Sequence, residues 1–292
     1  QHPLHSRFRY QIVYTERGVS LYNITSLSET FEYLTQVTDG LLLLHKAGFV
    51  HRDLSPGNII VVNRKAKISD LEFAKARKVA DLQSLTEQRM GSSQAIVDTC
   101  TGTLNFTAVE VVEGCYMFTL LGMMEQTRTF LYTPLHDYES VWWIATWVIF
   151  SCTSNTATDS TATRNRLFMH RASSFKDHTF RRYGSALPEE LQPLVKILDD
   201  MRKTLCREYI AYEGSFDRSL ILDMVPALIT HLQDLVEVAK GIGIEPLQED
   251  GGEAVGGGKI ESNKGVTGDG AGGWWNSNSP QVVPGFIHNY VE

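Results

Sequence analysis

A short polar segment between two regular elements, His-Arg-Asp-Leu-Ser-Pro-Gly-Asn at residues 51–58, places the strongest constraint on the fold. Before it, apolar residues from Phe31 to Leu44 recur at helical spacing, and Gly48 offers a natural end to that helix. After it, the β-branched run Ile59–Val62 is typical of a strand. The polar segment is therefore a loop that leads from a helix into a strand, so the fold must contain both kinds of element.

Helical periodicity dominates the rest of the chain as far as residue 240. Ser26 and Glu29 have the spacing of a capping box, in which each side chain satisfies the backbone N–H of the other, and they begin the first helix. The run from Val141 to Cys152 is almost wholly apolar and too short to span a bilayer, so it predicts a buried helix. The helices that we predict cover residues 26–48, 137–150, 188–212 and 215–239.

The predicted β-structure is short. Tyr10–Tyr14 is β-branched and aromatic and predicts a strand. Ile59–Val62 and Lys67–Ser69 flank the turn-like Asn63–Ala66, and together they predict a small hairpin beside the polar loop. Residues 76–101 and 153–163 are polar without a periodic apolar face, which predicts a long loop and a polar insertion. We therefore expect an α+β fold that is mainly α-helical and has a short β-hairpin.

Composition changes sharply after Gly241. The last 52 residues hold 13 of the 23 glycines, together with seven acidic and two basic side chains, so they carry −5 of the net charge of −7. A Gly-rich acidic segment with so few large apolar residues cannot bury enough surface to offset the entropy of ordering. The predicted organisation is one domain over residues 1–240, followed by a disordered tail over residues 241–292.

Charge and cysteine content argue against several functional classes. The first 240 residues carry only −2, whereas nucleic-acid-binding proteins normally show a basic surplus. The basic and aromatic stretch at 164–183 has a composition that also suits docking of an acidic substrate or nucleic acid, but we favour a solvated face whose aromatic side chains pack inward. We therefore expect neither nucleic acid nor a membrane among the partners. The cysteines form no C-x-x-C or Cys/His pair and indicate reduced thiols of an intracellular protein, cytoplasmic or nuclear: Cys100, Cys115, Cys152 and Cys206.

The loop at 51–58 resembles the catalytic loop H-R-D-L-x-x-x-N of protein kinases, in the expected place between a helix and a strand. Three further motifs follow in the order of that family. Asp70-Leu71-Glu72 resembles the D-F-G turn, and Gly102–Glu110 resembles the end of an activation segment, with Ala-Val-Glu in place of A-P-E. Asp137–Trp142 resembles the start of the central helix of the large lobe. The wording of these motifs is similar to the fungal-type protein kinases, over about residues 10–235, and implies a protein kinase C-terminal lobe with its hinge.

The resemblance implies a role for each polar residue of these motifs. Asp53 would act as the catalytic base that accepts the proton of the substrate hydroxyl, and Arg52 would bridge to the activation loop. Asn58 and Asp70 would hold Mg²⁺ and, through it, the phosphates of ATP. Glu72, which stands where the family has glycine, can add a further carboxylate to the metal site. Asp137 is expected to hold the backbone of the catalytic loop by hydrogen bonds.

Two parts of the family pattern are absent or changed. Only fifty residues precede His51, and they contain neither a Gly-rich loop nor a lysine in a V-A-I-K strand. The chain also begins with Gln1, so we expect a large lobe from which most of the small lobe is missing. Ser55 replaces the lysine that commonly neutralises the γ-phosphate in Ser/Thr kinases. His51 is expected to pack and to hydrogen-bond the backbone rather than to act as a base.

Three functions remain open from the sequence. The first is a protein kinase that moves the γ-phosphate of ATP to Ser or Thr hydroxyls of a protein substrate. The second is a catalytically weak pseudokinase or truncated scaffold, which the missing small-lobe motifs favour for this chain. The third is a small-molecule phosphotransferase of the aminoglycoside or choline kinase type. Arg52, the segment Gly102–Glu110 and Asp137 favour a protein kinase over the third.

Overall fold

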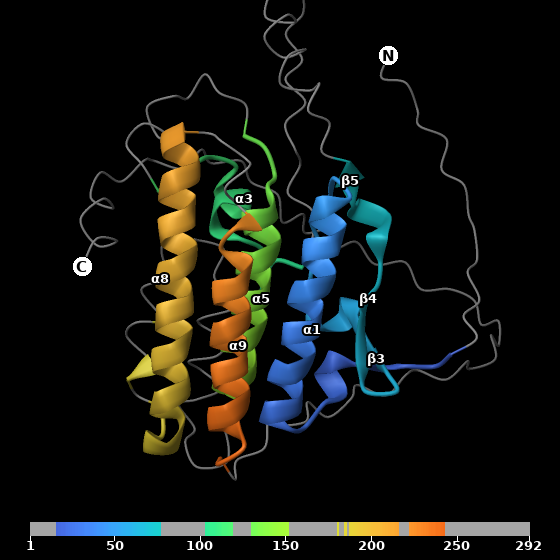
Figure 1. Cartoon of the computed structure of the whole chain (residues 1–292), viewed down its shortest axis with the longest axis vertical. Coiled ribbons are helices and arrows are strands. Elements are labelled where there is room, and N and C mark those ends of the chain that lie inside the picture. The colour runs from blue at the N-terminus through green and yellow to red at the C-terminus, as the bar shows by residue number, and fades with distance from the viewer. Residues whose placement is uncertain are drawn as a thin grey trace, which may run out of the picture. The chain divides into compact units, whose positions relative to one another are not determined.

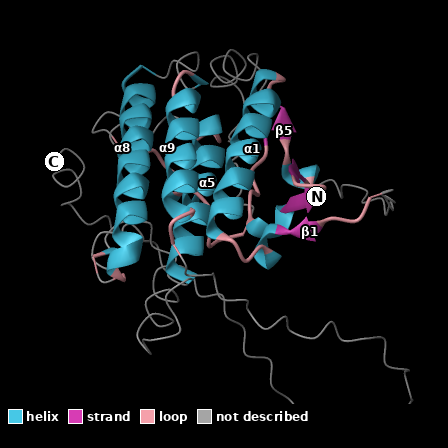
Figure 2. Ribbon diagram, turned by 60° about the horizontal axis from the view of Figure 1, so that its bottom comes forward, coloured by secondary structure: helices cyan, strands magenta, loops and turns pink. Residues whose placement is uncertain are grey.

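Four long helices pack side by side in the described part of the computed structural model, and short strands lie along one side of them (Figures 1 and 2). The structure describes residues 16–76, 103–118, 130–151, 180, 184–185, 187–215 and 222–242. The helices are α1 (Leu27–Lys46), α5 (Pro134–Ser151), α8 (Gln192–Ser215) and α9 (Val225–Ala239). Each packs mainly against two of the other three, so together they enclose the core.

Helix α1 begins and ends where the sequence predicts. The Ser26 side chain accepts a hydrogen bond of 3.3 Å from the Glu29 backbone N–H, which is one half of the predicted capping box. Just beyond the C-terminus, Gly48 has a φ of 87°, a left-handed conformation that glycine adopts without strain. The buried face follows the predicted helical spacing and consists of Leu27, Phe31, Leu34, Val37, Leu41 and His45, with Thr30, Tyr33 and Thr38.

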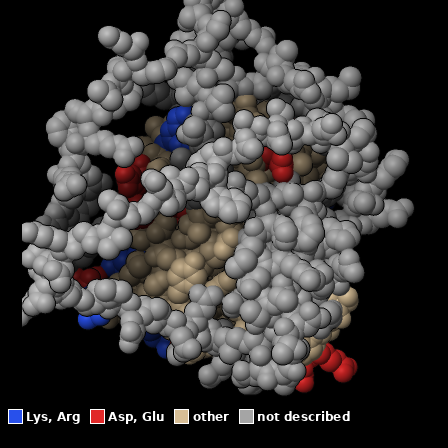
Figure 3. All heavy atoms as spheres, turned by 180° about the vertical axis from the view of Figure 1, so that it is seen from behind, with Lys and Arg blue, Asp and Glu red and all other residues tan. Residues whose placement is uncertain are grey.

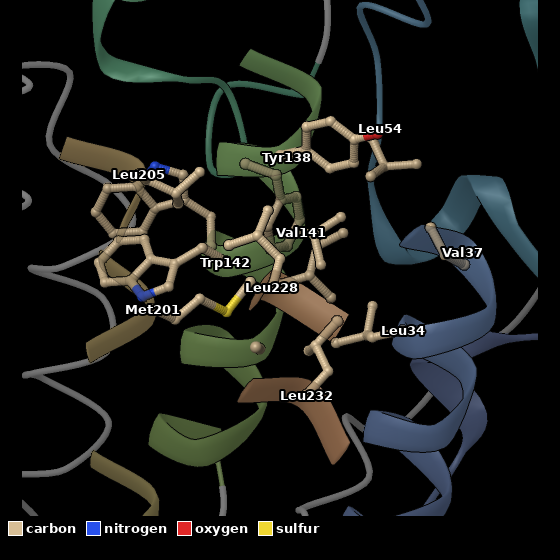
Figure 4. Close-up of a cluster of buried hydrophobic side chains, with 14 of the residues drawn as sticks. Leu34, Val37, Leu54, Tyr138, Val141, Trp142, Met201, Leu205, Leu228 and Leu232 are labelled. Carbon is tan, nitrogen blue, oxygen red and sulfur yellow. The ribbon is translucent and has the colours of Figure 1, made fainter. Parts of the chain in front are cut away.

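Helix α5 is the centre of the fold. Every residue in it except Trp147 is buried, as an apolar sequence without a polar face requires. It starts at Pro134, three residues before the predicted start, because proline is tolerated in the first turn, where its missing N–H would have no partner. Figure 4 shows its side chains meeting those of the other three helices and Leu54 of the polar loop in one cluster: Leu34, Val37, Leu54, Tyr138, Val141, Trp142, Met201, Leu205, Leu228 and Leu232.

The last two helices are shifted from their predicted bounds. Helix α8 continues to Ser215, and α9 starts only at Val225, ten residues after the predicted start at 215. Pro226 lies in the first turn of α9, which is the helical position that proline prefers. The apolar spacing used for the prediction begins at Leu222, so periodicity alone did not define this boundary.

The β-structure consists of two small antiparallel sheets among the described residues. One contains β1 (Val19–Ser20), β3 (Ile59–Val62) and β4 (Lys65–Ile68) in the order β1-β3-β4. The other pairs β2 (Phe49–Val50) with β5 (Lys75–Ala76). The hairpin of β3 and β4 confirms the prediction, but β4 begins two residues earlier than the predicted 67. The reason is a two-residue turn in which Asn63 and Arg64 both have positive φ, 50° and 61°.

Short helices complete the described elements. They are the five-residue α3 (Val109–Glu113) and the 3-10 helices η1 (Leu21–Asn23), η2 (Pro56–Asn58), η3 (Leu71–Phe73) and η5 (Glu189–Leu191). The α+β class, mainly helical with a short hairpin, is confirmed. Among the described helices, none is long and apolar enough to cross a membrane. On the face in Figure 3, the part of the described surface that can be seen is mainly uncharged, with a few acidic and basic side chains around it.

Several predicted segments lie outside the described residues. These are the strand at 10–14, nearly all of the loop at 76–101, the insertion at 153–163, most of the stretch at 164–183 and nearly all of the tail at 241–292. The described residues belong to one compact unit that spans Gln1–Leu247. The predicted domain boundary at residue 240 stays a prediction.

Candidate active site

The polar loop follows β2 directly and ends in η2, which leads into β3. Its first residue, His51, is fully buried. The Asp53 backbone N–H donates to His51 Nδ1 at 3.3 Å, so the imidazole proton lies on Nε2, which donates to the Ser69 carbonyl oxygen at 3.0 Å. Nε2 thus joins the loop to the chain after β4, and Nδ1 accepts a bond within the loop itself. The structure confirms that His51 packs and binds backbone.

Asp137 of α5 holds the polar loop through hydrogen bonds to its backbone. Its Oδ2 accepts the His51 N–H at 2.8 Å, and its Oδ1 accepts the Arg52 N–H at 3.0 Å. His45 Nε2 and the Tyr132 hydroxyl complete its shell at 2.8 and 2.9 Å. Burial by itself raises the pKa of the Asp137 carboxyl, but the hydrogen bond and charge of His45 and the two backbone amides outweigh it and lower the pKa. Asp137 is therefore the buried carboxylate that the sequence predicts as the holder of the loop backbone.

Arg52 has an unusual backbone conformation for a residue with a side chain. Its φ is 77°, in the left-handed region that costs a non-glycine residue about 1–2 kcal/mol. Its guanidinium carbon lies 5.8 Å from the centre of the Tyr132 ring, a cation–π contact. The Tyr132 ring and Asp137 therefore hold the two ends of Arg52. The contact of Arg52 with the activation loop stays a prediction, because residues 77–102 lie outside the described ranges.

The Asp53 carboxylate is held by a residue fifty positions later in the chain. Its Oδ1 accepts from the Thr103 backbone N–H at 2.8 Å and from the Thr103 hydroxyl at 3.1 Å. Asn58 binds the backbone of the same residue, because its Nδ2 donates to the Asp53 carbonyl oxygen at 2.9 Å. Because the Asn58 amide nitrogen is used in this way, its amide oxygen Oδ1 is the atom that remains for a metal.

The hairpin brings Asp70 next to Asn58. Ile59 pairs with Ile68, so Asn58 and Ser69 lie opposite one another at the end of the ladder. The Ser69 N–H and hydroxyl both bind the Asn58 carbonyl oxygen, at 2.9 and 3.0 Å. Asp70 follows with a φ of 58° and an exposed side chain, a strained conformation of the kind that marks functional sites. The backbones of two predicted metal ligands are therefore neighbours at the end of this hairpin, and their ligation of a metal stays a prediction.

The donor set at this edge suits magnesium. Amide and carboxylate oxygens are ligands that Mg²⁺ accepts, and the ion keeps several waters or phosphate oxygens in its shell. Glu72, two residues beyond Asp70 in η3, has an exposed side chain, and none of its contacts joins it to Asn58 or Asp70 among the described residues. Within the described ranges, no cluster of three His, Cys, Asp or Glu side chains forms a separate metal site.

Thr103, His45 and Tyr132 are site residues that the sequence did not single out. Thr103 lies within the segment predicted as the end of an activation segment, but no spacing rule links it to Asp53. His45 offered a better signal, because it is a polar residue on the buried face of α1, four positions after Leu41. Its imidazole bridges Asp137 and the Tyr138 hydroxyl, which lies 3.1 Å from Nδ1.

Comparison with known proteins places these contacts in a family context. The sequence model described as fungal protein kinase matches residues 2–149. The putative serine/threonine-protein kinase L232 of Acanthamoeba polyphaga mimivirus is 50% identical over 46 residues, which is 16% of this chain and 7% of that protein. Serine/threonine-protein kinase NLK2 of Xenopus laevis is 31% identical over 93 residues, 31% of this chain and 21% of that protein.

A plant kinase gives a similar picture. Mitogen-activated protein kinase kinase kinase 3 of Arabidopsis thaliana is 35% identical over 105 residues, 36% of this chain and 14% of that protein. The chain therefore matches at most 21% of the length of these three relatives.

Proposed function

The chain belongs to the fungal protein kinase family, and from the arrangement of its polar loop we propose that it supplies the large lobe of an ATP-dependent serine/threonine protein kinase. The observation that carries the proposal is the placement of Asp53 between Thr103 and Asn58, on a loop fixed to Asp137. Phosphoryl transfer needs positioned groups and charge neutralisation more than covalent chemistry by the protein. A rigidly held carboxylate next to an oxygen-rich metal edge meets that need.

Asp53 has one oxygen for each of two tasks. Thr103 donates twice to Oδ1, which fixes the carboxylate in space. Oδ2 is then the oxygen that orients the hydroxyl of the substrate and accepts its proton as the phosphoryl group moves. Asn58 Oδ1 and the Asp70 carboxylate would hold Mg²⁺, with Glu72 as a third candidate ligand. When bound, the metal neutralises the charge of the ATP phosphates.

The choice of Ser and Thr as acceptors is supported by the relatives. Two of the three similar proteins carry the name serine/threonine-protein kinase, and the match to them includes only part of their length. The Arg52, Thr103 and Asp137 contacts favour a protein acceptor over a small molecule, since they are built from the motifs that the sequence shares with protein kinases. A protein substrate is thus part of the proposal.

A catalytically weak scaffold is the second candidate. Ser55 is buried and stands where a lysine commonly neutralises the γ-phosphate. A buried hydroxyl cannot supply that charge. This candidate predicts binding to partner proteins without turnover.

The test is a phosphate-transfer assay with labelled ATP and Mg²⁺. The acceptors are a degenerate Ser/Thr peptide library, a Tyr peptide library, choline and an aminoglycoside. The enzyme forms are residues 1–292 and the same residues joined to the small lobe of a fungal protein kinase, each with an Asp53→Asn control. We expect label on Ser/Thr peptides with the joined form and none with its control. Label on the small molecules, or no transfer from the joined form, would contradict the proposal.

A further inference from the structure

Two glutamates from distant parts of the chain meet inside the protein, away from the polar loop. Glu110 lies on α3 and Glu213 near the end of α8, and both are fully buried. Their carboxyl groups lie against the same backbone amide. The Met117 N–H donates to Oε1 of both, at 2.8 Å to Glu110 and 3.2 Å to Glu213. Two buried carboxyl groups that share one N–H can bond to one another directly only if one of them carries a proton.

The donors identify Glu213 as the charged partner. The Phe118 N–H approaches both of its oxygens, at 2.9 and 3.1 Å, in addition to the Met117 contact. Backbone amides stabilise the ionised form of a carboxyl group, because it accepts only. Glu213 therefore holds the chain immediately after α3 against the C-terminal turns of α8.

His136 of α5 gives Glu110 a hydrogen bond in its neutral form. The Thr133 N–H donates to His136 Nδ1 at 2.8 Å, so Nδ1 carries no proton. The ring proton lies on Nε2, 3.1 Å from Glu110 Oε2, and donates to it. This tautomer leaves the imidazole uncharged, so His136 positions Glu110 without supplying a positive charge.

The remaining titratable groups around the pair do not favour ionisation of Glu110. Glu139 of α5 is a second buried acid, which accepts from the Val109 N–H, the Trp143 Nε1 and the Tyr209 hydroxyl. Burial, the hydrogen bond and charge of Glu213, and the charge of Glu139 raise the pKa of Glu110 well above its usual value. The Met117 amide acts in the opposite direction and is outweighed. Among the described residues, Tyr209 of α8 and Cys115 and Tyr116 after α3 also interact with the pair, and Tyr212 of α8 interacts with Tyr116.

We propose that Glu110 is a neutral carboxylic acid that donates its proton to the Glu213 carboxylate, and that this shared proton holds α3 in place. Loss of the proton would leave two adjacent buried anions, which repel one another and cannot both stay ionised without separating. Glu213 is then a positioning residue for the segment that contains Thr103. This last step rests on the proposed kinase function, whereas the shared proton does not.

The path from the pair to Asp53 runs through a short, well-packed segment. Only five residues separate Thr103 from Val109, the first residue of α3, and Phe106 and Ala108 among them are buried. Thr103 makes both hydrogen bonds to Asp53 Oδ1. When α3 leaves α8, this segment loses its fixed end, so the Thr103 contacts and the surface beside Asp53 that receives the substrate change together.

The experiment uses the whole chain and begins with two readouts that need no catalysis. Infrared spectra at neutral pH measure the C=O band of a protonated carboxyl group, and hydrogen exchange measures the protection of the Met117 and Phe118 amides. Wild type is compared with Glu213→Gln, whose amide can donate to an ionised Glu110 and so removes the need for the proton. Glu113→Gln, an exposed acid on the same helix, is the matched control.

We expect the carboxylic-acid band in wild type and in Glu113→Gln, and its loss in Glu213→Gln. We also expect protection of the two amides to fall by about tenfold or more as pH rises from neutral into the alkaline range in wild type and to stay constant in Glu213→Gln. Glu110→Gln should give the same spectra and exchange as Glu213→Gln. If Glu213→Gln does not fold, Glu110→Gln provides the test in its place. A missing acid band, or the same loss of protection in the glutamine variants, overturns the proposal.

A kinase assay then separates this proposal from the proposed function. In a form active on peptides, the KM for peptide should rise over the same pH range while the KM for ATP stays constant, and Glu213→Gln should remove the rise. A KM that does not follow the amide protection would overturn the positioning role. If wild type phosphorylates nothing, the proposed function fails, and the spectra and exchange still decide whether the shared proton exists.

Discussion

At the scale of single residues, Asp53 is the side chain on which the proposed chemistry depends. We predict that Asp53→Asn lowers phosphotransferase activity by about 10²–10⁴-fold, because the amide cannot accept the substrate proton. The fold should be unchanged, since the Asn oxygen can still accept both hydrogen bonds of Thr103. Initial rates and thermal melting of the two proteins, each joined to a small lobe, provide the measurement. Retention of most of the activity would count decisively against Asp53 as the base.

Tyr132 allows the two supports of Arg52 to be separated. Tyr132→Phe keeps the ring beside the guanidinium but removes the hydroxyl that donates to Asp137 at 2.9 Å. We predict a loss of about 1.5–3 kcal/mol in the free energy of unfolding, as for other hydrogen bonds to charged groups. Tyr132→Leu should cost more, because it also removes the cation–π contact. Denaturant titration measures both.

Tyr209→Phe is the matched control for this prediction. The Tyr209 hydroxyl is also buried and also donates to a carboxylate, Glu139, at 2.7 Å, but it does not reach the polar loop. Its loss of stability should be similar, while the hydrogen exchange of the Arg52 amide should change only in the Tyr132 variants. Equal exchange in both sets would show that Tyr132 does not hold Arg52.

The site residues that the sequence predicted differ from those that it missed in how far along the chain their contact partners lie. Asp53, Asn58 and Asp70 belong to short motifs whose geometry is set by one loop and one hairpin. The motifs alone were therefore sufficient to predict that these residues belong to one site. Thr103 and Tyr132 act through partners fifty and eighty residues away, on elements whose packing no local pattern specifies. The roles of Arg52 at the activation loop and of Glu72 at the metal stay predictions.

At the scale of elements, Asp137 joins α5 to the polar loop and to α1. We predict that Asp137→Ala costs about 3–5 kcal/mol of unfolding free energy, because it leaves the His51 and Arg52 amides and two side-chain donors buried without their acceptor. Asp200→Ala is the control: that residue forms an exposed ion pair with Lys203, which is worth at most about 1 kcal/mol. A melting curve of Asp137→Ala unchanged from wild type would show that the tether contributes nothing.

The two buried acids of this region should give opposite dependences of stability on pH. The Asp137 pKa is lowered by folding, so its contribution is present above the unfolded value near about pH 4 and is lost as pH falls through the folded value. The Glu110 pKa is raised, so its contribution is fully present below the unfolded pKa of glutamate and is lost as pH rises through the folded value.

We therefore predict two changes in the plot of melting temperature against pH. Asp137→Asn should flatten the acid side, and Glu110→Gln should flatten the alkaline side, relative to wild type. Scans at a series of pH values, with the exposed Glu113→Gln as control, measure this directly. If Glu110→Gln leaves the alkaline side unchanged, other groups cause the loss of stability there.

The helices were easier to predict than their ends and the turns between strands. Ser26 and Gly48 defined α1 because capping chemistry is local, and α5 was evident from its apolar sequence. The start of α9 was missed because Leu222 continues the apolar spacing, although the helix begins only at Val225 beside Pro226. The β3–β4 turn was predicted too long, since the positive φ of Arg64 is favoured by the hairpin twist and not by the residue type.

At the scale of the whole molecule, three large apolar side chains near the polar loop are exposed. Phe49 on β2 is 41% exposed, and Leu71 and Phe73, directly after Asp70, are 52% and 38% exposed. The side chains that we propose for the metal and its nucleotide are those of Asn58 and Asp70, with Glu72 as a further candidate. A glycine-rich loop and a strand lysine, which cover the phosphates in protein kinases, do not occur in the sequence before His51.

This arrangement predicts weak binding of nucleotide by residues 1–292 themselves. Asn58 and Asp70, with Glu72 if it ligates, can hold a hydrated Mg²⁺, but the ion depends on phosphate oxygens for the rest of its shell. Each missing charge-assisted hydrogen bond to the phosphates is worth about 1.5–3 kcal/mol, so the loss of two or three weakens binding by at least about a hundredfold. We predict a dissociation constant for ATP–Mg²⁺ of about millimolar or weaker, with negligible turnover. Joining a small lobe before the chain should restore both, and isothermal titration of the two forms measures the difference. A micromolar, Mg²⁺-dependent constant for residues 1–292, abolished by Asp70→Asn, would show that this lobe holds ATP without the glycine loop and the lysine.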